Sequence, residues 1–129
     1  DIAFRDKVIE LMHRTLKGVT AAHGAKYEMD YKKGYPVVIN NADLVKQLLP
    51  TMQRIVGKEN AREITPGLGG EDFAYFANIV PGFYYRLGCA NEKKGIIGGA
   101  HTPAFDVDEE CLRTGVEVMA AMVCDFLKE

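Results

Sequence analysis

The sequence predicts an α/β protein, because segments with helical periodicity alternate with short extended apolar runs. Two long segments, one near each end, repeat apolar residues every three or four positions, and the stretch FYYRLG at 83–88 is apolar and bounded by turn residues. The chain has 129 residues, 47% of them hydrophobic and 26% charged, which suits one globular domain or parts of two. We therefore expect helices layered on a sheet.

The first segment predicts a helix, a turn and a strand. Gly24 is expected to end the helix in a left-handed conformation, and residues 25–31, AKYEMDY, alternate as a strand does. The apolar positions of the helix, with charged residues opposite, are Val8, Leu11, Met12, Leu16 and Val19.

The segment KKGYP at 32–36 interrupts both patterns and is a candidate domain boundary, followed by the short extended run 37–39. Either Asn40 or Asn41 can cap a second helix, which should end before Gly57. Pro50 lies inside this helix, so we expect a kink or a break there.

The second half of the chain predicts two strands and a short helix. A strand is expected at 61–65, and after the loop PGLGG at 66–70 a helix should carry Glu71 and Asp72 in its first turn, where acids complement the helix dipole. The run 83–88 is expected to form a buried strand, and 91–95 a charged surface turn.

The last segment predicts an amphipathic helix. Asp106 and Glu109 have capping-box spacing, so we expect Asp106 to be the N-cap. The residues expected to be buried are Leu112, Val116, Met119, Val123 and Phe126.

Composition excludes several classes of function. The balance of 16 basic and 18 acidic residues gives no basic stripe, so we expect no nucleic-acid partner. No apolar run approaches the roughly 18 to 20 residues of a membrane span, and the first residues are charged, so we expect no membrane partner and a cytoplasmic location. The three cysteines show no CxxC spacing and are expected to be reduced. A chain that opens on Asp1, almost directly into a helical pattern, is expected to be a fragment.

His101 is the strongest candidate for chemistry. It follows a glycine pair and precedes a Thr-Pro turn, and a neutral imidazole is the commonest protein ligand of zinc-like metals. A catalytic zinc needs about three protein ligands, so one histidine gives part of a site at most. The alternative is an ordinary histidine of a surface loop. His13 and His23 stand among charged residues and are expected to be solvated.

Other polar residues each have a functional and a structural interpretation. Glu71 and Asp72 could act as acid and base or orient a metal-bound histidine, but stabilisation of a helix N-terminus is the stronger interpretation. The backbone of Gly69 and Gly70 could approach an anion, although the lysine of a P-loop is absent. Remaining candidates are Asn40 and Asn41, as caps or as donors to a substrate carbonyl, and Arg86, as an anion holder or a partner in a sheet-edge salt bridge.

Three phrases, distributed over nearly the whole chain, carry a resemblance to a known family. They are FRDKVIELMHRTLKGVTAAHGAKYEMDYKKGYPVVINNADL, GGEDFAYFANIVPGFYYRLG and HTPAFDVDEECLRTG. In order and spacing they resemble the C-terminal part of M20-family metallopeptidases, in particular the amidohydrolase branch that includes hydrolases of N-acyl amino acids, hippurate and auxin conjugates.

The resemblance implies a two-domain enzyme. Residues 1–37 would be the trailing helix and strand of an α+β lid domain that mediates dimerisation, and residues 38–129 the C-terminal part of an α/β/α layered catalytic domain. The family binds two divalent ions, zinc, manganese or a similar metal, and His101 matches its last metal ligand. Asn40 matches an asparagine near the domain junction, and Gly69, Gly70, Glu71 and Asp72 match the loop that borders the substrate cleft.

Two residues depart from the family pattern: Gly70 stands where serine is common and Asn41 where aspartate is common. By the same resemblance the general-base glutamate and the other metal ligands belong upstream, so no catalytic residue is expected in this chain and the isolated chain should be inactive. The complete enzyme would cleave the amide bond of a small N-acyl amino acid or peptide with metal-activated water. The alternative is a non-catalytic assembly module. In either case we expect a homodimer or a swapped assembly, because the lid remnant would leave an unpaired edge.

Overall fold

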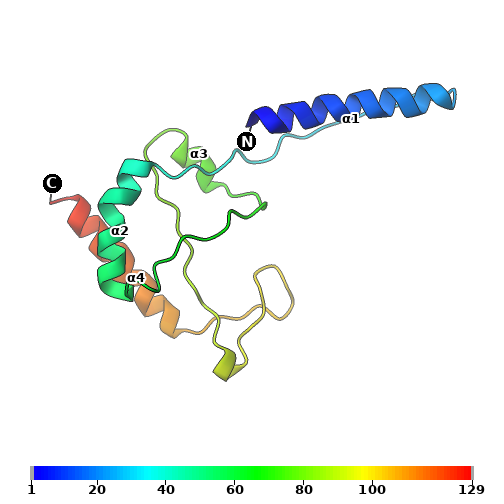
Figure 1. Ribbon diagram of the computed structural model, residues 1–129. Coiled ribbons are helices and arrows are strands. Elements are labelled where there is room, and N and C mark those ends of the chain that lie inside the picture. The colour runs from blue at the N-terminus through cyan, green and yellow to red at the C-terminus, as the bar shows by residue number, and fades with distance from the viewer. Residues whose placement is uncertain (1, 129) are drawn as a thin grey trace. The chain divides into compact units, whose positions relative to one another are not determined.

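The computed structural model describes residues 2–128 of the chain, and regular structure there is mostly helical (Figure 1). The chain divides into two compact units, one made of the residues up to 39 together with 68–80, the other of 40–67 together with 81–129. The elements are α1 (Ile2–Ala22), α2 (Ala42–Val56), α3 (Phe73–Ala77), the 3-10 turn η1 (Glu92–Lys94) and α4 (Glu110–Phe126).

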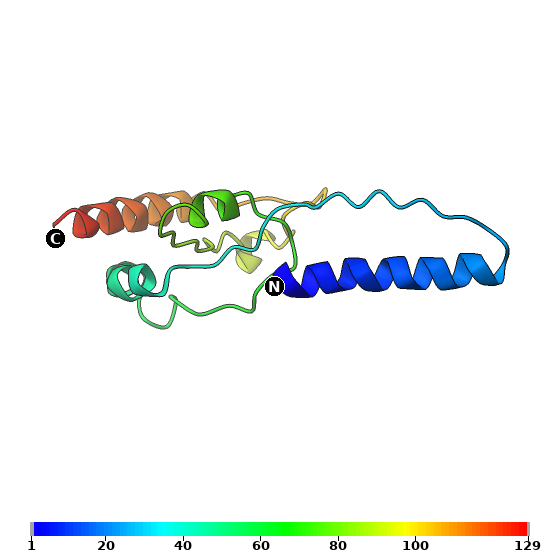
Figure 2. The same cartoon turned by 90° about the horizontal axis from the view of Figure 1, so that it is seen from above.

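In the first unit, α1 ends as expected. Gly24 has φ +60°, a left-handed conformation that an L side chain rarely adopts, and it reverses the chain direction (Figure 2). Ala25 then donates its backbone N–H to the carbonyl of Thr20 at 2.9 Å, which satisfies one of the last free carbonyls of the helix.

The segment after Gly24 runs back along α1 (Figures 1 and 2). The Tyr27 hydroxyl lies 3.2 Å from His13 Nδ1 at the middle of the helix. Lys33 Nζ donates to Asp6 at 2.9 Å near its start. Residues 25–36 form no strand; beyond the bond from Ala25 to Thr20, the hydrogen bonds that hold them to α1 involve side chains.

In the second unit, α2 begins at the predicted cap. Asn41 has extended backbone angles, and its side-chain oxygen accepts the backbone N–H of Leu44 at 2.9 Å. The helix ends before Gly57, whose φ is +86°. It continues through Pro50 as one element, so the break considered for that position is absent.

The core of this unit lies between α2 and α4. The side chains of Leu48, Val118 and Met122 are buried there, and Phe83 and Tyr85 pack against them. Figure 1 shows the two helices side by side, and Figure 2 shows that their axes cross.

The residues expected to be buried on α4 are exposed. Val116 and Met119 are 69% and 51% exposed, whereas Val118 and Met122 are 2% and 5% exposed. The expected stripe therefore lies on a different face from the one that contacts α2. The whole set, Leu112, Val116, Met119, Val123 and Phe126, is at least 50% exposed.

The cap of α4 also differs from the prediction. The helix begins at Glu110, and Asp106 uses its carboxylate to accept the backbone N–H of the adjacent Val107 at 2.8 Å. Asp106 therefore bonds locally, and it cannot be the N-cap because the helix begins four residues after it.

The expected sheet does not form among residues 2–128, which contain only two isolated bridges, Asn91 with Ile96 and Gly98 with Phe105. A β-ladder needs a second extended segment alongside the first, and no two extended segments in the described range pair in this way. Residues 83–86 nevertheless keep the alternation of a strand, since Phe83 and Tyr85 contact the core while Arg86 is exposed, but the alternation ends at Leu87, which is exposed. In the same range, no helix is long and apolar enough to cross a membrane.

Candidate functional site

His101 lies at the exposed tip of the loop that joins η1 to α4. Its φ is +66°, the only positive value among the described residues other than glycine. Histidine tolerates this conformation better than most residues do, at a cost of roughly 1 to 2 kcal/mol. The loop must hold it there, and it does so with two short closures: Thr102 Oγ1 donates to the carbonyl of Gly99 at 2.8 Å, and Phe105 N–H to that of Thr102 at 3.1 Å.

Gly98 shows how tightly this loop is closed. A Cβ atom added to it would lie 1.9 Å from the carbonyl oxygen of Ala104, far inside contact distance. The backbone at Gly98 can therefore meet Phe105, with which it forms a bridge, only because it carries no side chain. Gly98 and Gly99 form the glycine pair before His101. Steric fit alone explains why Gly98 is a glycine.

The described residues around the loop provide one metal ligand, His101, and do not complete a site. His101 offers one exposed imidazole, and within residues 2–128 no group of three or more His, Cys, Asp or Glu side chains is arranged to hold an ion. A catalytic zinc needs about three protein ligands. These residues therefore do not form a complete metal site, and no reaction step can be derived through one.

The side-chain amide of Asn40 is hydrogen-bonded twice to the backbone of Tyr84. Its Nδ2 donates to the Tyr84 carbonyl at 2.9 Å, and its Oδ1 accepts the Tyr84 N–H at 2.7 Å. This reciprocal pair reproduces the bonds that a neighbouring strand would make. A substrate could use only the remaining hydrogen and lone pair of the amide.

The predicted loop residues 69–72 belong to the other compact unit. A Cβ atom at Gly70 would lie 2.6 Å from Cδ2 of the Tyr35 ring, so the serine common in the resembling family would displace that ring here. At Gly69 the corresponding space is open. Tyr35 was not singled out from sequence, although the Tyr-Pro pair that contains it belongs to the motif.

Glu71 and Asp72 precede α3 and do not lie in its first turn, contrary to the prediction. Glu71 is half-buried, and its Oε1 accepts the backbone N–H of Phe73 at 3.2 Å. Asp72 is exposed and occupies the N-cap position without a side-chain capping bond. Glu71 therefore still stabilises the start of α3, by accepting its first N–H from outside the helix, whereas Asp72 makes no such bond.

Arg86 does not form the salt bridge considered for it. Its Nη2 lies 2.9 Å from where a Cβ of Gly67 would be, so the guanidinium covers that glycine, and within residues 2–128 it makes no ion pair.

The structure joins the predicted residues to neighbours, but among the described residues it does not join them to one another by hydrogen bonds. Asn40 contacts Tyr84, and the side chain of Glu71 contacts the backbone of Phe73. The side chain of His101 makes no hydrogen bond in residues 2–128.

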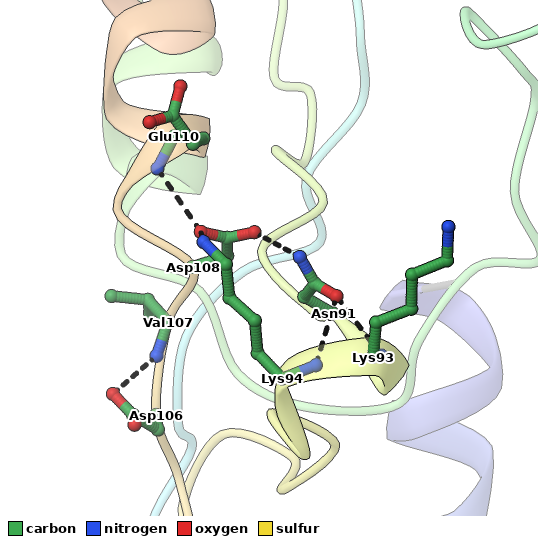
Figure 3. Close-up of polar contacts among 7 residues, drawn as sticks. All are labelled: Asn91, Lys93, Lys94, Asp106, Val107, Asp108 and Glu110. Atoms are coloured by element: carbon green, nitrogen blue, oxygen red, sulfur yellow. Dashed lines mark hydrogen bonds and ion pairs between the residues drawn. The ribbon is translucent and has the colours of Figure 1, made fainter.

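One polar cluster near His101 was missed from sequence. Asp108, in the loop before α4, accepts hydrogen bonds from the side chains of Asn91 and Lys94 (Figure 3). The Asn91 hydrogen bond, followed by that of Lys94, holds the pKa of the Asp108 carboxyl below its usual value. The available signal was the spacing of Asn91 and Gly95 around a charged turn, which predicts the turn but not its partner.

Comparison with known proteins assigns the chain to a family. The family model described as peptidase family M20/M25/M40 matches residues 4–125, which is nearly the whole chain. The chain belongs to this family. The family membership expected from the resemblance is thereby confirmed.

Several named relatives of this M20 chain are hydrolases. YhaA of Bacillus subtilis, whose name describes it as an amidohydrolase, is 34% identical over 95% of this chain and 31% of its own length. Thermostable carboxypeptidase 2 of Saccharolobus solfataricus is 32% identical over 95% of this chain and 30% of its own length. The IAA-amino acid hydrolase ILR1-like 2 of Arabidopsis thaliana is 36% identical over 73% of this chain and 21% of its own length.

The M20 chain thus spans less than a third of the length of these relatives. No solved structure matches it significantly.

Proposed function

We propose that this chain is the C-terminal portion of a metal-dependent amidohydrolase, which cleaves the amide bond of N-acyl amino acids or similar small conjugates. The observation that carries the proposal is the family match over residues 4–125, a range that includes every predicted site residue. The names of two relatives, an amidohydrolase and an IAA-amino acid hydrolase, support an amide as the bond cleaved.

In this proposal His101 supplies one nitrogen ligand, and the other ligands come from residues outside these 129. Two divalent ions, zinc or manganese, would supply Lewis acidity and lower the pKa of bound water. Within this chain, Asn40, Gly69, Gly70, Glu71 and Asp72 would border the substrate. The exposed position of His101 and the open space at Gly69 are compatible with these roles.

The proposal extends to the architecture of the complete protein. Residues 1–37 would belong to a lid domain and residues 38–129 to an α/β/α catalytic domain, in which 83–88 pairs with strands from outside this chain. The alternation of Phe83 and Tyr85 toward the core supports such a strand. The complete protein would be a cytoplasmic homodimer or a swapped assembly.

Zinc titration of the 129-residue chain, followed by NMR of the imidazole signals, tests the role of His101. Zinc should perturb the His101 ring at concentrations that leave His13 and His23 unchanged, although all three are exposed. His23 is the more stringent control, because Nδ1 of His13 already lies 3.2 Å from the Tyr27 hydroxyl and is less available to zinc. Equal effects on all three rings would contradict a special role for His101.

Hydrolysis of hippurate with added zinc or manganese tests the activity. We expect the isolated chain to be inactive. A product extended by the coding region before Asp1 should be active, and His101→Ala should lower its rate at least about a hundredfold, more than the loss of a residue that only orients a ligand. Turnover by the 129-residue chain that survives His101→Ala would refute this assignment.

The alternative is a non-catalytic module that assembles through the lid remnant. Apolar side chains on α1 line an open hollow, and this observation favours it: Val8, Leu11, Met12 and Leu16 lie there. Light scattering distinguishes the two functions when combined with the assay: a dimer dissociated by Met12→Glu, together with an inactive extended product, would favour the module.

A further inference from the structure

The loop that carries His101 begins and ends at the same place in the fold. Asn91 and Ile96 exchange two backbone hydrogen bonds of 2.8 and 2.9 Å, which fixes the turn before the loop. Asp108, at the other end, donates its backbone N–H to the carbonyl of Cys89 at 2.8 Å. Residues 97–107 therefore leave and return to one point, as in an Ω-loop.

The Asp108 carboxylate stabilises the point where the two ends of this loop meet. Asn91 Nδ2 donates to one of its oxygens at 2.5 Å and Lys94 Nζ to the other at 2.6 Å (Figure 3). The Asp108 side chain is only 13% exposed, although that of Lys94 is 53% exposed. Short bonds to an ionised, largely covered carboxylate are stronger than those of an ordinary surface pair.

The turn that supplies these donors is itself ordered by Asn91. Its Oδ1 accepts the backbone N–H groups of Lys93 and Lys94 at 3.1 and 3.3 Å, while its Nδ2 reaches Asp108. One amide thus shapes η1 and ties it to the residue before α4. That turn also places Lys94 within hydrogen-bonding distance of Asp108.

We propose that Asp108, held by Asn91 and Lys94, is a positioning residue that keeps the His101 loop closed and thereby holds His101 in its left-handed conformation. The geometry links Asp108 to His101. Along the chain, the bridge between Gly98 and Phe105 lies between His101 and the bonds of Asp108. Fixing both ends of the loop reduces the number of conformations that it can adopt. Less conformational entropy is then lost when the imidazole binds a ligand. The inference rests on the proposed function in one respect only, namely that the imidazole of His101 binds a metal.

A purely structural role for Asp108 would be to start α4. Its Oδ1 also accepts the backbone N–H of Glu110, but at 3.4 Å this bond is much longer than the two from Asn91 and Lys94. Asp108→Ser separates the two roles. A serine can still accept a hydrogen bond at a helix start, but it is too short to bond Asn91 and Lys94 together.

The test is NMR of the 129-residue chain, read at His101. The intraresidue NOE from amide proton to Hα is strong only when φ is positive. It should be strong in the wild-type chain, lost in Asp108→Ser, weakened in Lys94→Met, and retained in Lys94→Arg. The matched control is Asp106→Ser, since Asp106 is exposed and its side chain bonds only the adjacent Val107 N–H; it should retain the NOE.

A weak NOE in the wild-type chain, or a strong one in both Asp108→Ser and Lys94→Met, would overturn the inference. If Asp108→Ser does not fold, Lys94→Met decides alone, because it alters an exposed side chain.

Zinc titration of the same variants separates this inference from the proposed function. Asp108→Ser and Lys94→Met should need about tenfold more zinc to perturb the His101 ring. Such a loss of metal affinity is typical when a residue that orients a ligand is removed. If zinc leaves His101 unperturbed in the wild-type chain while the NOE is lost in Asp108→Ser and weakened in Lys94→Met, the metal role fails and the positioning role stands. If zinc binds equally in all variants and the NOE is unchanged, the positioning role fails.

Discussion

At the scale of single residues, the amide of Asn40 takes the place of a neighbouring strand at Tyr84. Asn40→Ala removes two hydrogen bonds, each worth about 1 kcal/mol, so urea unfolding should show a loss of about 1 to 2 kcal/mol. Asn78→Ala is the control, because Asn78 is also exposed and its side chain makes no hydrogen bond within residues 2–128; its effect should stay within about 0.5 kcal/mol. Equal losses would show that the Tyr84 bonds add no stability.

Single residues were predictable where the deciding partner is close in sequence. Asn41 caps α2 because Leu44, three residues on, supplies the N–H. The same reasoning failed for Asp106, whose side chain bonds the adjacent Val107 N–H, because the helix begins four residues after it. His101 was found from its glycine-flanked loop, but Asp108 was not, because its partner Asn91 lies 17 residues away.

At the scale of elements, α4 has two apolar faces and buries only one against α2. Met122→Ala leaves a cavity in the core, so we expect a loss of about 2 to 3 kcal/mol in chemical denaturation. Met119→Ala makes the same change on the same helix at a side chain that is 51% exposed, and should stay within about 0.5 kcal/mol. The reverse order would mean that α4 turns its other face inward.

Sequence could predict that α4 is a helix, but not which face it buries. Val118 and Met122 are four residues apart, as are Leu112 and Val116, so both stripes have helical spacing. The choice depends on where α2 and the segment 83–88 lie, and this is tertiary information. Strand pairing could not be predicted for the same reason: an apolar run between turn residues indicated that 83–88 is extended, but a ladder depends on a partner that residues 2–128 do not provide.

At the scale of the whole molecule, the order of the helices followed from periodicity, whereas the sheet did not form. Matching relatives are more than three times as long as this chain, so in the proposed complete enzyme most strands would come from elsewhere. The exposed stripe of α4 and the segment 83–88, which joins no β-ladder within residues 2–128, are then surfaces that such strands could cover. This explains why the family was recognisable from motifs although its architecture is not visible in the described residues.

Two carboxylates join distant parts of the second unit, and both titrate below their usual range. Asp125 on α4 accepts hydrogen bonds from Thr51 and Arg54 on α2, at 2.8 and 2.7 Å. The Thr51 bond, followed by that of Lys128, holds the pKa of Asp125 below its ordinary value of 3.8. In the unfolded chain the carboxyl takes up its proton near the ordinary value, whereas the folded chain takes it up only at lower pH.

Protons therefore bind the unfolded chain more readily, and stability should fall as pH decreases through and below 3.8. Urea unfolding at a series of pH values from about 6 to 2 measures this slope. Asp125→Asn cannot ionise, so its stability should depend less on pH in that window and should differ most from the wild type near neutrality. Asp43→Asn is the control, because Asp43 is exposed on α2 and forms no ion pair within residues 2–128. If both variants keep the wild-type slope, Asp125 does not link the packing of α2 and α4 to pH, and the slope comes from other carboxyl groups with lowered pKa values, such as Asp108 and Glu10.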